Sequence, residues 1–403
     1  MNFSIELADM RIAIEKLMPA IPPKSTLPVL EHIYASLSGG ELKLVSTDQD
    51  LTIEHNCSVG GAGDGKVLLP ARKIFEITKA LGSSGVIGFE IDDASFDIRV
   101  KTKTGKFQMK GLNPEEYLDL PELRESSKPE HDGEKFIGES STGNNVAFFN
   151  KSDISKICAK TFFAVSNDEF RPAMTGVLFQ FRKEYVNAVS TDSYRLAKAV
   201  AKSENSSFPD EIDIILPKKI VEILKSAEHD VLLSFLENGS KLTHIRFDIA
   251  NTVYISRIID EKFPPYEAVI PDDNDKSLIV DKSELLKAIK LVSIFSSNIS
   301  KQIRVAVSAG QILVKGQDED SGSDAREIIT CEYDGEELEI GFNFKYLEDA
   351  VSYIDSGDNN TVKFTFSEST RPALVMADKG GDEEGDDEEG DDVLMLIMPV
   401  RIS

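Results

Sequence analysis

The sequence predicts an α+β protein built from three topologically similar domains, and three observations support this prediction. The chain has 403 residues, more than one hydrophobic core usually supports. A series of sequence landmarks occurs twice in the same order and a third time more loosely. Each copy combines about two helical segments with short alternating segments that are typical of antiparallel strands.

The first two copies share three landmarks in one order. The tetrapeptide Val-Ser-Thr-Asp stands at 45–48 and again at 189–192. A Leu-Pro pair followed by a helical pattern comes next, in LLPARKIFEITKAL at 68–81 and ILPKKIVEILKSA at 215–227. A segment rich in proline, with one tyrosine, then closes each copy, at 113–121 and 263–271. The offsets of 144 and 147 residues between the first two pairs of landmarks indicate an internal repeat.

The last third of the chain repeats this outline. The segment VDKSELLKAIKLVS at 280–293 predicts an opening helix, in which Asp281 and Glu284 have capping-box spacing and Leu285, Ile289 and Val292 form an apolar stripe. A strand pair is predicted at 303–316 and a second helix at 341–354, while 101–112 and 244–259 predict strands in the earlier copies. The six helices are therefore expected at 7–18, 72–82, 151–160, 217–227, 281–291 and 343–353.

Polar, turn-rich segments at 124–134 and 272–276 separate the copies. We predict domains at 1–126, 132–262 and 263–403, the last with an acidic insert at 378–392. This insert holds ten acidic residues and one lysine, a composition that is normally a solvated loop.

Composition predicts a soluble cytoplasmic protein. The start, MNFSIELADM, carries acids where a secretory signal is basic and then apolar, and the longest apolar runs are interrupted by charges. The three cysteines, Cys57, Cys158 and Cys331, have no CxxC pairing, so we expect small buried side chains and no disulfide framework or metal site.

Positive charge is concentrated on the predicted helices. Together these helices carry a formal charge of +6, although the whole chain carries −25. In the fourth helix Ile220 and Leu224 form one face, and Lys218 and Lys225 lie on another. An ordinary solvated face explains one such helix, but the pattern recurs on four of six helices in an acidic protein. This recurrence favours a surface that binds the phosphates of nucleic acid without reading bases, since no base-reading motif is present.

Enzyme chemistry is not indicated. The five histidines are scattered without HxxxH spacing, and neither GxGxxG nor GxxxxGK[ST] occurs. Asp48 and Asp50 resemble a two-metal carboxylate pair, but Asp48 recurs as Asp192 whereas Asp50 becomes Tyr194. A turn role explains these aspartates better, so we predict no catalytic residue, no metal ligand and no cofactor.

Ten segments spread along the chain share one family pattern: IPPKSTLPVLEHI, STDQDL, LLPARKIFEITKAL, KTKTGKFQMKGLNPEEYLDLP, TFFAVSNDEFRPAMTGVLFQ, STDSYRLA, ILPKKI, FPPYEAVIP, IGFNFKYLEDAV and IMPVRI. In combination they resemble the bacterial DNA polymerase III beta subunit family, the sliding clamps. The resemblance implies the DNA clamp fold, with antiparallel sheets outside and helices lining the inner face of a ring-shaped homodimer. It also implies a processivity factor that encircles duplex DNA, slides without sequence preference and tethers its partners.

The resemblance further implies three sets of site residues. DNA contacts fall on helix cations and on two loop positions: Arg72, Lys73, Lys79, Lys156, Lys160, Lys218, Lys219 and Lys225, with Lys24 and Arg171. An apolar cleft between domains 2 and 3 takes peptides of the replicative polymerase, the clamp loader complex, other polymerases and repair proteins. The matching positions are Met174, Thr191, Leu196, Pro264, Val269, Asn343, Tyr346, Thr370, Pro372, Leu396, Ile397, Met398, Pro399, Val400 and Arg401.

Two alternatives stay open at this stage. Leu396 and Ile397 fit the core of a last strand as well as they fit a cleft. The chain as a whole also fits a repeat scaffold that binds proteins without encircling DNA. For the dimer, the resemblance implies that Phe107 and Met109, on an edge strand of domain 1, meet the region of Phe295 in a second copy.

Three positions depart from the family pattern. Ala268 replaces an arginine found in some relatives beside the cleft, Ser193 replaces a frequent glycine, and Ser403 extends the usual end. Ala268 leaves the peptide specificity open.

Overall fold

The computed structural model describes residues 1–61, 63–118, 130–132, 135–137, 146–202, 209, 211–238, 241–356, 359–378 and 393–402. Most of the predicted boundary between residues 126 and 132, and all but the first residue of the predicted acidic insert at 378–392, lie outside the described residues. The chain divides into two compact units, one of residues 1–151 and 227–258 and the other of residues 152–226 and 259–403.

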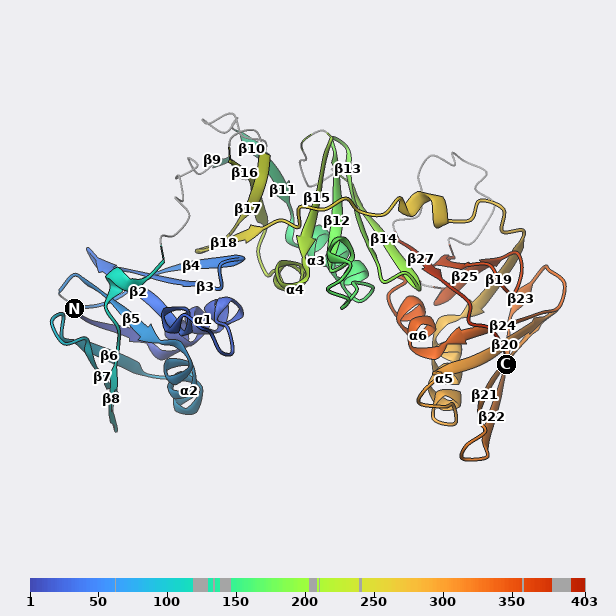
Figure 1. The fold of residues 1–403 in the computed structure, drawn as a ribbon, viewed down its shortest axis with the longest axis horizontal. Coiled ribbons are helices and arrows are strands. Elements are labelled where there is room, and N and C mark those ends of the chain that lie inside the picture. The colour runs from blue at the N-terminus through green and yellow to red at the C-terminus, as the bar shows by residue number, and fades with distance from the viewer. Residues whose placement is uncertain are drawn as a thin grey trace. The chain divides into compact units, whose positions relative to one another are not determined.

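The first unit contains a four-stranded antiparallel sheet and an eight-stranded antiparallel sheet (Figure 1). Helices α1 (Leu7–Leu17) and α2 (Ala71–Leu81) contact each other. The smaller sheet has the order β1 (Asn2–Glu6), β6 (Val86–Ile91), β7 (Asp97–Lys101), β8 (Lys106–Lys110). The larger has the order β11 (Val146–Phe149), β16 (Val231–Asn238), β17 (Lys241–Ile249), β18 (Thr252–Arg257), β4 (Leu51–Ser58), β3 (Glu41–Thr47), β2 (His32–Ser38), β5 (Gly65–Pro70). A separate pair is formed by β9 (Glu130–Asp132) and β10 (Lys135–Ile137).

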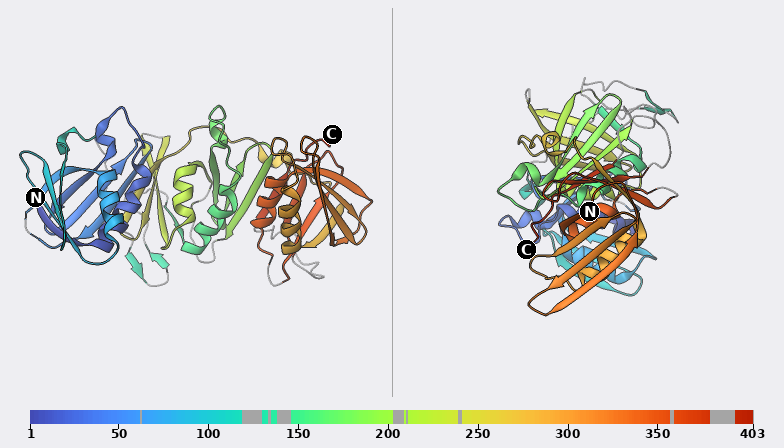
Figure 2. Two further views of the ribbon diagram at one scale, coloured as in Figure 1. Left: turned by 90° about the horizontal axis from the view of Figure 1, so that it is seen from below. Right: turned by 90° about the vertical axis from the view of Figure 1, so that its right-hand side faces the viewer.

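The second unit contains a nine-stranded and a four-stranded antiparallel sheet. Figure 2 shows the third repeat, in orange and red, from two further sides. Its helices are α3 (Lys151–Phe162), α4 (Lys218–Lys225), α5 (Lys282–Ser293) and α6 (Phe344–Ser352), of which α5 and α6 contact each other. The larger sheet has the order β15 (Ile212–Pro217), β12 (Gly176–Arg182), β13 (Tyr185–Thr191), β14 (Arg195–Lys202), β27 (Val393–Ile397), β26 (Ala373–Ala377), β25 (Thr361–Phe366), β19 (Lys276–Asp281), β23 (Glu332–Tyr333). The smaller has the order β22 (Ser323–Thr330), β21 (Gln311–Asp318), β20 (Gln302–Ser308), β24 (Leu338–Asn343).

The predicted threefold repeat is confirmed by the order of the elements. Each repeat runs strand, helix, four strands, helix, three strands, and the third adds only the two-residue strand β23. Each repeat contributes two runs of four strands to the sheets. Counted along the repeat and without β23, one run has the order first, sixth, seventh, eighth, and the other has the order fifth, second, third, fourth. All six predicted helices are present, with ends within two residues of the predicted positions.

Strand pairing also joins one repeat to the next. The fourth strand of the first repeat, β4, pairs with the eighth strand of the second, β18. In the same way β14 of the second repeat pairs with β27 of the third. Two strands of this type have no such neighbour in the described residues, the eighth strand of the first repeat (β8) and the fourth strand of the third (β22).

The core follows from the two periodicities that the sequence carries. Along β20, Ile303, Val305 and Val307 are buried, and the residues between them are partly exposed, as the period of a strand requires. The predicted stripe of α5 is buried, and the side chain of Asp281 accepts a hydrogen bond from the Glu284 backbone N–H at 2.8 Å. This contact confirms the N-cap that starts the helix.

None of the helices in the described part of the chain combines the length and the apolar character needed to cross a membrane.

Candidate functional site

The joint between the second and third repeats, within the second unit, gathers many of the residues predicted for the peptide site. Arg195 and Leu196 of β14 lie opposite Ile397 and Leu396 of β27. Beyond β27, the Met398 N–H donates to the Tyr194 carbonyl at 2.8 Å, and the Val400 N–H donates to the Gly341 carbonyl at 2.8 Å. Main-chain hydrogen bonds therefore hold the carboxyl-terminal run against the turn of the second repeat and against β24.

Arg195 is the central side chain of this joint. Its Nε donates to Asp192 Oδ2 at 3.0 Å, its Nη2 donates to the Phe163 carbonyl at 2.7 Å, and its Nη1 donates to Asp349 Oδ2. The guanidinium group lies 4.5 Å from the ring centroid of Tyr346 and 5.2 Å from that of Phe163. A planar group with several donors and a flat face makes both kinds of contact at once, so Arg195 links the turn of the second repeat to α6 of the third.

Aromatic rings extend this link on both sides. Tyr194 stacks on Tyr346 with a centroid distance of 6.3 Å, and Phe163 stacks on Tyr353 at 4.5 Å. Burial raises the pKa of the Tyr346 hydroxyl, with a smaller contribution from the nearby Asp192 carboxylate. Tyr346 therefore stays neutral at physiological pH and presents an apolar ring.

Four of the predicted peptide-site residues are buried in this structure. Leu196 and Leu396 are both 3% exposed and belong to one apolar cluster with Leu178, Val189, Ile215, Phe263, Tyr266 and Leu374, and Ile397 is fully buried. Thr191 is also buried, and its hydroxyl donates to the Arg195 carbonyl at 2.7 Å. Leu396 and Ile397 are successive residues of β27 and therefore point to opposite faces of the sheet, and both are buried, as the reading of them as core residues of a last strand expects.

The exposed apolar residues of this joint are Met398, Val269 and Tyr194, of which 36%, 52% and 59% are exposed. Met174 and Pro264 are half-buried, and the sulfur of Met174 lies 3.6 Å from the Ser193 hydroxyl. Sequence reasoning missed Tyr194 and Arg195, although both stand inside the segment STDSYRLA. The remaining predicted residues are exposed (Thr370 and Arg401) or half-buried (Asn343, Tyr346, Pro372, Pro399 and Val400).

Ser193 stands at a position where the family that the sequence resembles often has glycine. Its backbone has φ of +78°, a region that favours glycine, and Gln49 at the equivalent position of the first repeat has φ of +80°. The serine hydroxyl accepts a hydrogen bond from Arg171 Nη1 at 2.6 Å. A glycine would offer no such partner, so the serine holds a predicted DNA-contacting side chain close to Met174.

Nine of the ten predicted DNA-contacting cations are exposed or half-buried. Lys24, Arg72, Lys73, Lys79, Lys156, Arg171 and Lys219 are exposed, and Lys218 and Lys225 are half-buried. The Lys225 ammonium lies 4.3 Å from the ring centroid of Phe162, and Lys218 Nζ donates to Asn167 Oδ1 at 2.9 Å. Arg171 forms an ion pair with Asp168 at 2.8 Å.

Lys160 corrects the prediction of an exposed cation on α3. Only 6% of this residue is exposed. Its ammonium pairs with Asp355 at 2.8 Å and donates to the Tyr353 carbonyl. Burial lowers the pKa of Lys160, and the hydrogen bond to Asp355 opposes this shift. Lys160 therefore serves the fold, while Lys156, one turn earlier, is exposed.

The aspartates of the repeated tetrapeptide act in turns. Asp48 Oδ1 accepts hydrogen bonds from the backbone N–H groups of Asp50 and Leu51, at 3.1 and 2.8 Å. Asp192 Oδ1 accepts the equivalent bonds from Tyr194 and Arg195. The predicted turn role is confirmed. Across the residues that the structure describes, no group of three His, Cys, Asp or Glu side chains could hold a metal ion.

The edge strands β8 and β22, which lack a partner from another repeat among the described residues, lie at or near the residues predicted for the dimer. On β8 Phe107 is 37% exposed, whereas Met109 is 7% exposed and already largely covered. On the side of β22, Ile328 is 65% exposed and Phe295, just after α5, is 42% exposed. Apolar side chains at an open sheet edge are a surface that a further strand covers.

The chain is similar over its whole length to one protein family. Residues 1–121, 149–265 and 267–400 match the N-terminal, central and C-terminal domains of the DNA polymerase III beta subunit. The beta sliding clamp of Pseudomonas putida is 26% identical over 404 residues, with 100% of both chains covered. The Bacillus subtilis DNA polymerase sliding clamp shares the fold with a TM-score of 0.84 at 22% identity, with 100% of both chains covered. The Pseudomonas aeruginosa sliding clamp bound to griselimycin has a TM-score of 0.83 at 24% identity, again with full coverage.

Proposed function

This chain belongs to the DNA polymerase III beta subunit family, and on that premise we propose that it acts as a sliding clamp. Two copies form a ring around duplex DNA, and the ring holds the replicative polymerase and other replication and repair proteins at their site of work. The protein works in the cytoplasm as a tether and not as an enzyme, because a raised local concentration of polymerase needs no bond chemistry.

The single observation that carries this proposal is the repeated joint. Two joints within the chain, β4 with β18 and β14 with β27, use the fourth strand of one repeat and the eighth strand of the next. The free strands β8 and β22 are the two halves of a third joint. Two copies arranged head to tail pair β8 of each copy with β22 of the other, so neither of these two edges stays open, which is how a closed homodimer forms.

The DNA contacts of this proposal come from the exposed cations. Lys24, Lys73 and Lys156 present ammonium groups that bind phosphate through charge and carry no base recognition. Such contacts are weak and exchange quickly, so a ring that uses them slides. Closure of the ring, and not affinity, then accounts for persistence on DNA.

The peptide site of this proposal uses the exposed part of the second joint. Val269 and Met398, which are exposed, and Met174, which is half-buried, offer flexible or small apolar side chains, and the rings of Tyr194 and Tyr346 stack on each other. Methionine adapts its shape to different ligands, which suits a site that receives peptides from several proteins. Leu196, Leu396 and Ile397 form the floor of the joint and act through their support of these residues.

The test compares circular with linear DNA. A clamp loader ATPase would place the full-length protein on a nicked plasmid, and retention would be measured by gel filtration before and after one restriction cut. The proposal expects retention on the circle and rapid loss from the linear form, together with a dimer in equilibrium sedimentation. Retention that does not depend on DNA ends would overturn the ring and support the scaffold alternative.

A further inference from the structure

The fourth strands of the three repeats, β4, β14 and β22, can be aligned residue by residue through their pairing with the third strands. The third strand of each repeat begins directly after a two-residue hairpin turn. It starts at Glu41 in the first repeat, Tyr185 in the second and Gln311 in the third. The seventh residue of each third strand pairs across to Thr52, Leu196 and Asp324 respectively. These three residues are therefore equivalent, and so are the residues that follow them, Ile53, Ala197 and Ala325.

The eighth strands, β8, β18 and β27, can be aligned in the same way. The starting point is the residue of the first strand that lies four places before the opening helix, and the strand pairing is then followed across the sheet. Pairing leads from Phe3 through Phe89 and Val100 to Phe107 in the first repeat. It leads from Ala147 to Tyr254 in the second repeat. In the third repeat it leads from Leu278 to Met395. Phe107, Tyr254 and Met395 are therefore equivalent.

Both internal joints place these equivalent residues opposite each other. Tyr254 lies opposite Ile53, Met395 lies opposite Ala197, and all four are buried. Applied to the free edges, the same register places Phe107 of a second copy opposite Ala325. A large side chain then meets a small one, as it does at Met395 and Ala197.

The next pair in this register brings two cations together. Lys106 of a second copy lies opposite Arg326, whereas the equivalent internal pairs, Val253 with Glu54 and Leu394 with Lys198, hold one charge each. Like charges directly opposite in a sheet repel and destabilise the pair. The joint between β8 of one copy and β22 of the other, called the seam from here on, is therefore destabilised by a charge repulsion that the internal joints lack.

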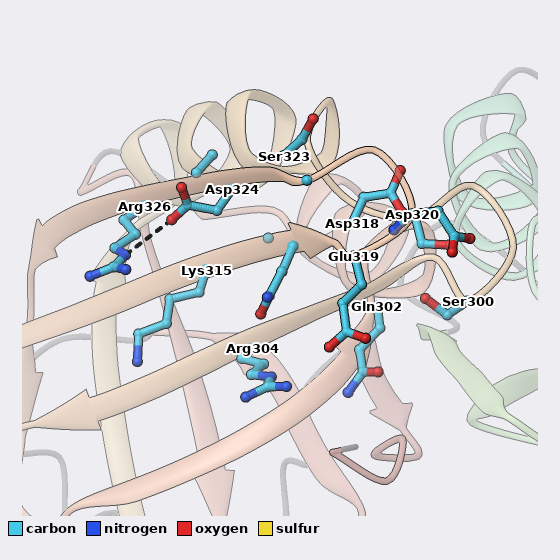
Figure 3. Close-up of a pocket in the computed structure, with 15 residues that line it drawn as sticks. Ser300, Gln302, Arg304, Lys315, Asp318, Glu319, Asp320, Ser323, Asp324 and Arg326 are labelled. Carbon is cyan, nitrogen blue, oxygen red and sulfur yellow. Dashed lines mark hydrogen bonds and ion pairs between the residues drawn. The ribbon is translucent and has the colours of Figure 1, made fainter.

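The two cations also belong to a longer row. Arg326 lies opposite Lys315, which lies opposite Arg304, and in β7 Lys101 lies opposite Lys106. Figure 3 shows Arg304, Lys315 and Arg326 on three neighbouring strands, where they help to line a hollow of about 780 Å³ that Asp318, Glu319 and Asp320 also line.

Acidic residues balance only part of this row. Asp324 lies 3.4 Å from Arg326, Glu339 lies 3.7 Å from Lys315, and Glu90 pairs with Lys101. The pair of Asp324 and Arg326 is well exposed to solvent, so a competing anion can replace it. The side chain of Lys106 forms no hydrogen bond or close ion pair within the described residues, although, after the hydrogen bond from Lys101, its charge helps to lower the pKa of Glu90.

We propose that the seam between two copies binds an anion with several phosphate groups, which bridges Lys106 of one copy and Arg326 of the other. Arginine receives phosphate oxygens through two parallel N–H groups, and lysine adds a point charge. The anion relieves the repulsion and stabilises the closed dimer by mass action. This inference rests on the dimer of the proposed function.

Equilibrium sedimentation of the full-length protein tests the inference, with sodium tripolyphosphate as the probe and sodium chloride of equal ionic strength as the reference. With the anion at ten times its dissociation constant, we expect the dimer to tighten about tenfold per seam. Arg326→Glu replaces repulsion with attraction, so this variant should dimerise about three- to tenfold more tightly in chloride and lose its response to tripolyphosphate.

Three further variants complete the test. Lys106→Glu, on the other strand of the seam, should reproduce the effect of Arg326→Glu. The double variant should be weaker than either single one, because two acids then face each other. Lys66→Glu, with the same charge change on β5 outside the row, should respond as the natural protein does.

Two results would overturn the inference while the dimer stands: dimers that ignore tripolyphosphate, or an Arg326→Glu variant that dimerises less tightly than the natural chain. A chain that stays monomeric in both salts would instead contradict the proposed function.

Discussion

At the scale of single residues, His55 makes the first joint sensitive to acid. Its Nδ1 lies 2.8 Å from the Thr252 hydroxyl, across the pairing of β4 with β18, and burial lowers its pKa from 6.5 to about 4. Between these values the unfolded chain binds a proton that the folded chain does not, so stability falls as the pH falls from 6.5 towards 4. We expect urea unfolding at pH 5 to show a loss of about 1–2 kcal/mol relative to pH 7.

The His55→Gln variant is the control for this effect, because glutamine keeps a polar contact with Thr252 and does not titrate. Its stability should change less between pH 7 and pH 5 than that of the natural protein. An equal loss in both proteins would assign the acid sensitivity to other groups.

Arg195 is the residue on which the second joint depends most. Its side chain is 13% exposed, and Asp192 and Asp349 both pair with it. Arg195→Ala leaves two carboxylates without their cation and removes the stack on Tyr346. We expect the free energy of unfolding to fall by about 2–4 kcal/mol in denaturant titrations. Arg195→Lys, which keeps the charge but not the planar fork, should fall between. A loss below about 0.5 kcal/mol for the alanine variant would remove Arg195 from this role.

At the scale of elements, α3 contains its own matched pair of lysines. Lys156 is exposed, whereas Lys160 is buried against Asp355 and Tyr353. For short duplex DNA, log affinity falls as log salt rises. Lys156→Ala should make the slope of this fall less steep by about 1, because one phosphate contact is lost. Lys160→Met should leave that slope unchanged and alter stability instead. Fluorescence anisotropy measures the slope, and equal slopes for both variants would place Lys156 away from DNA.

The last strand and its extension separate support from contact. Met398 is 36% exposed and Leu396 is 3% exposed. Met398→Ala should weaken binding of a polymerase-derived peptide and change stability by less than about 0.5 kcal/mol. Leu396→Ala should cost about 2–5 kcal/mol of stability through the cavity that it leaves. Calorimetric titration with the peptide and urea unfolding measure the two effects.

A truncation tests the same element more broadly. Deletion of the final four residues removes Val400, whose N–H bonds to the Gly341 carbonyl, and Arg401. Polymerase stimulation should be lost while the dimer remains, because neither free edge is touched. A truncated protein that still stimulates the polymerase would place the peptide site elsewhere.

At the scale of the whole molecule, salt should affect direct DNA binding and retention of a loaded ring differently, because the first depends on charge and the second on ring closure. Direct binding to linear duplex DNA should weaken by orders of magnitude between about 50 and 200 mM salt if several phosphates are contacted. A ring already loaded on a circle should survive the same wash, because its release needs an opened joint and not a broken phosphate contact. Equal salt sensitivity on circles and on linear DNA would contradict topological linkage.

Much of the architecture was accessible from the sequence because it rests on local rules. The helices follow from apolar stripes of period 3.6, the start of α5 from Asp281, and the turns from the repeated Asp48 and Asp192. Repetition of these signals along 403 residues then predicts three equivalent repeats without any knowledge of distant contacts.

Only the tertiary structure decided which side chains of a given pattern are available. Lys156 and Lys160 lie one turn apart and look alike in the sequence, and both approach Asp355, at 3.7 and 2.8 Å, but only Lys160 is buried. Leu396 is buried because residues from both repeats, such as Phe263 and Leu374, pack with it in one cluster, and Arg195 becomes a link because α6 supplies Asp349 and Tyr346. Burial and charge pairing depend on segments far apart in the chain, whereas periodicity and capping depend on neighbours, so the sequence alone determined the repeats and the fold determined the site.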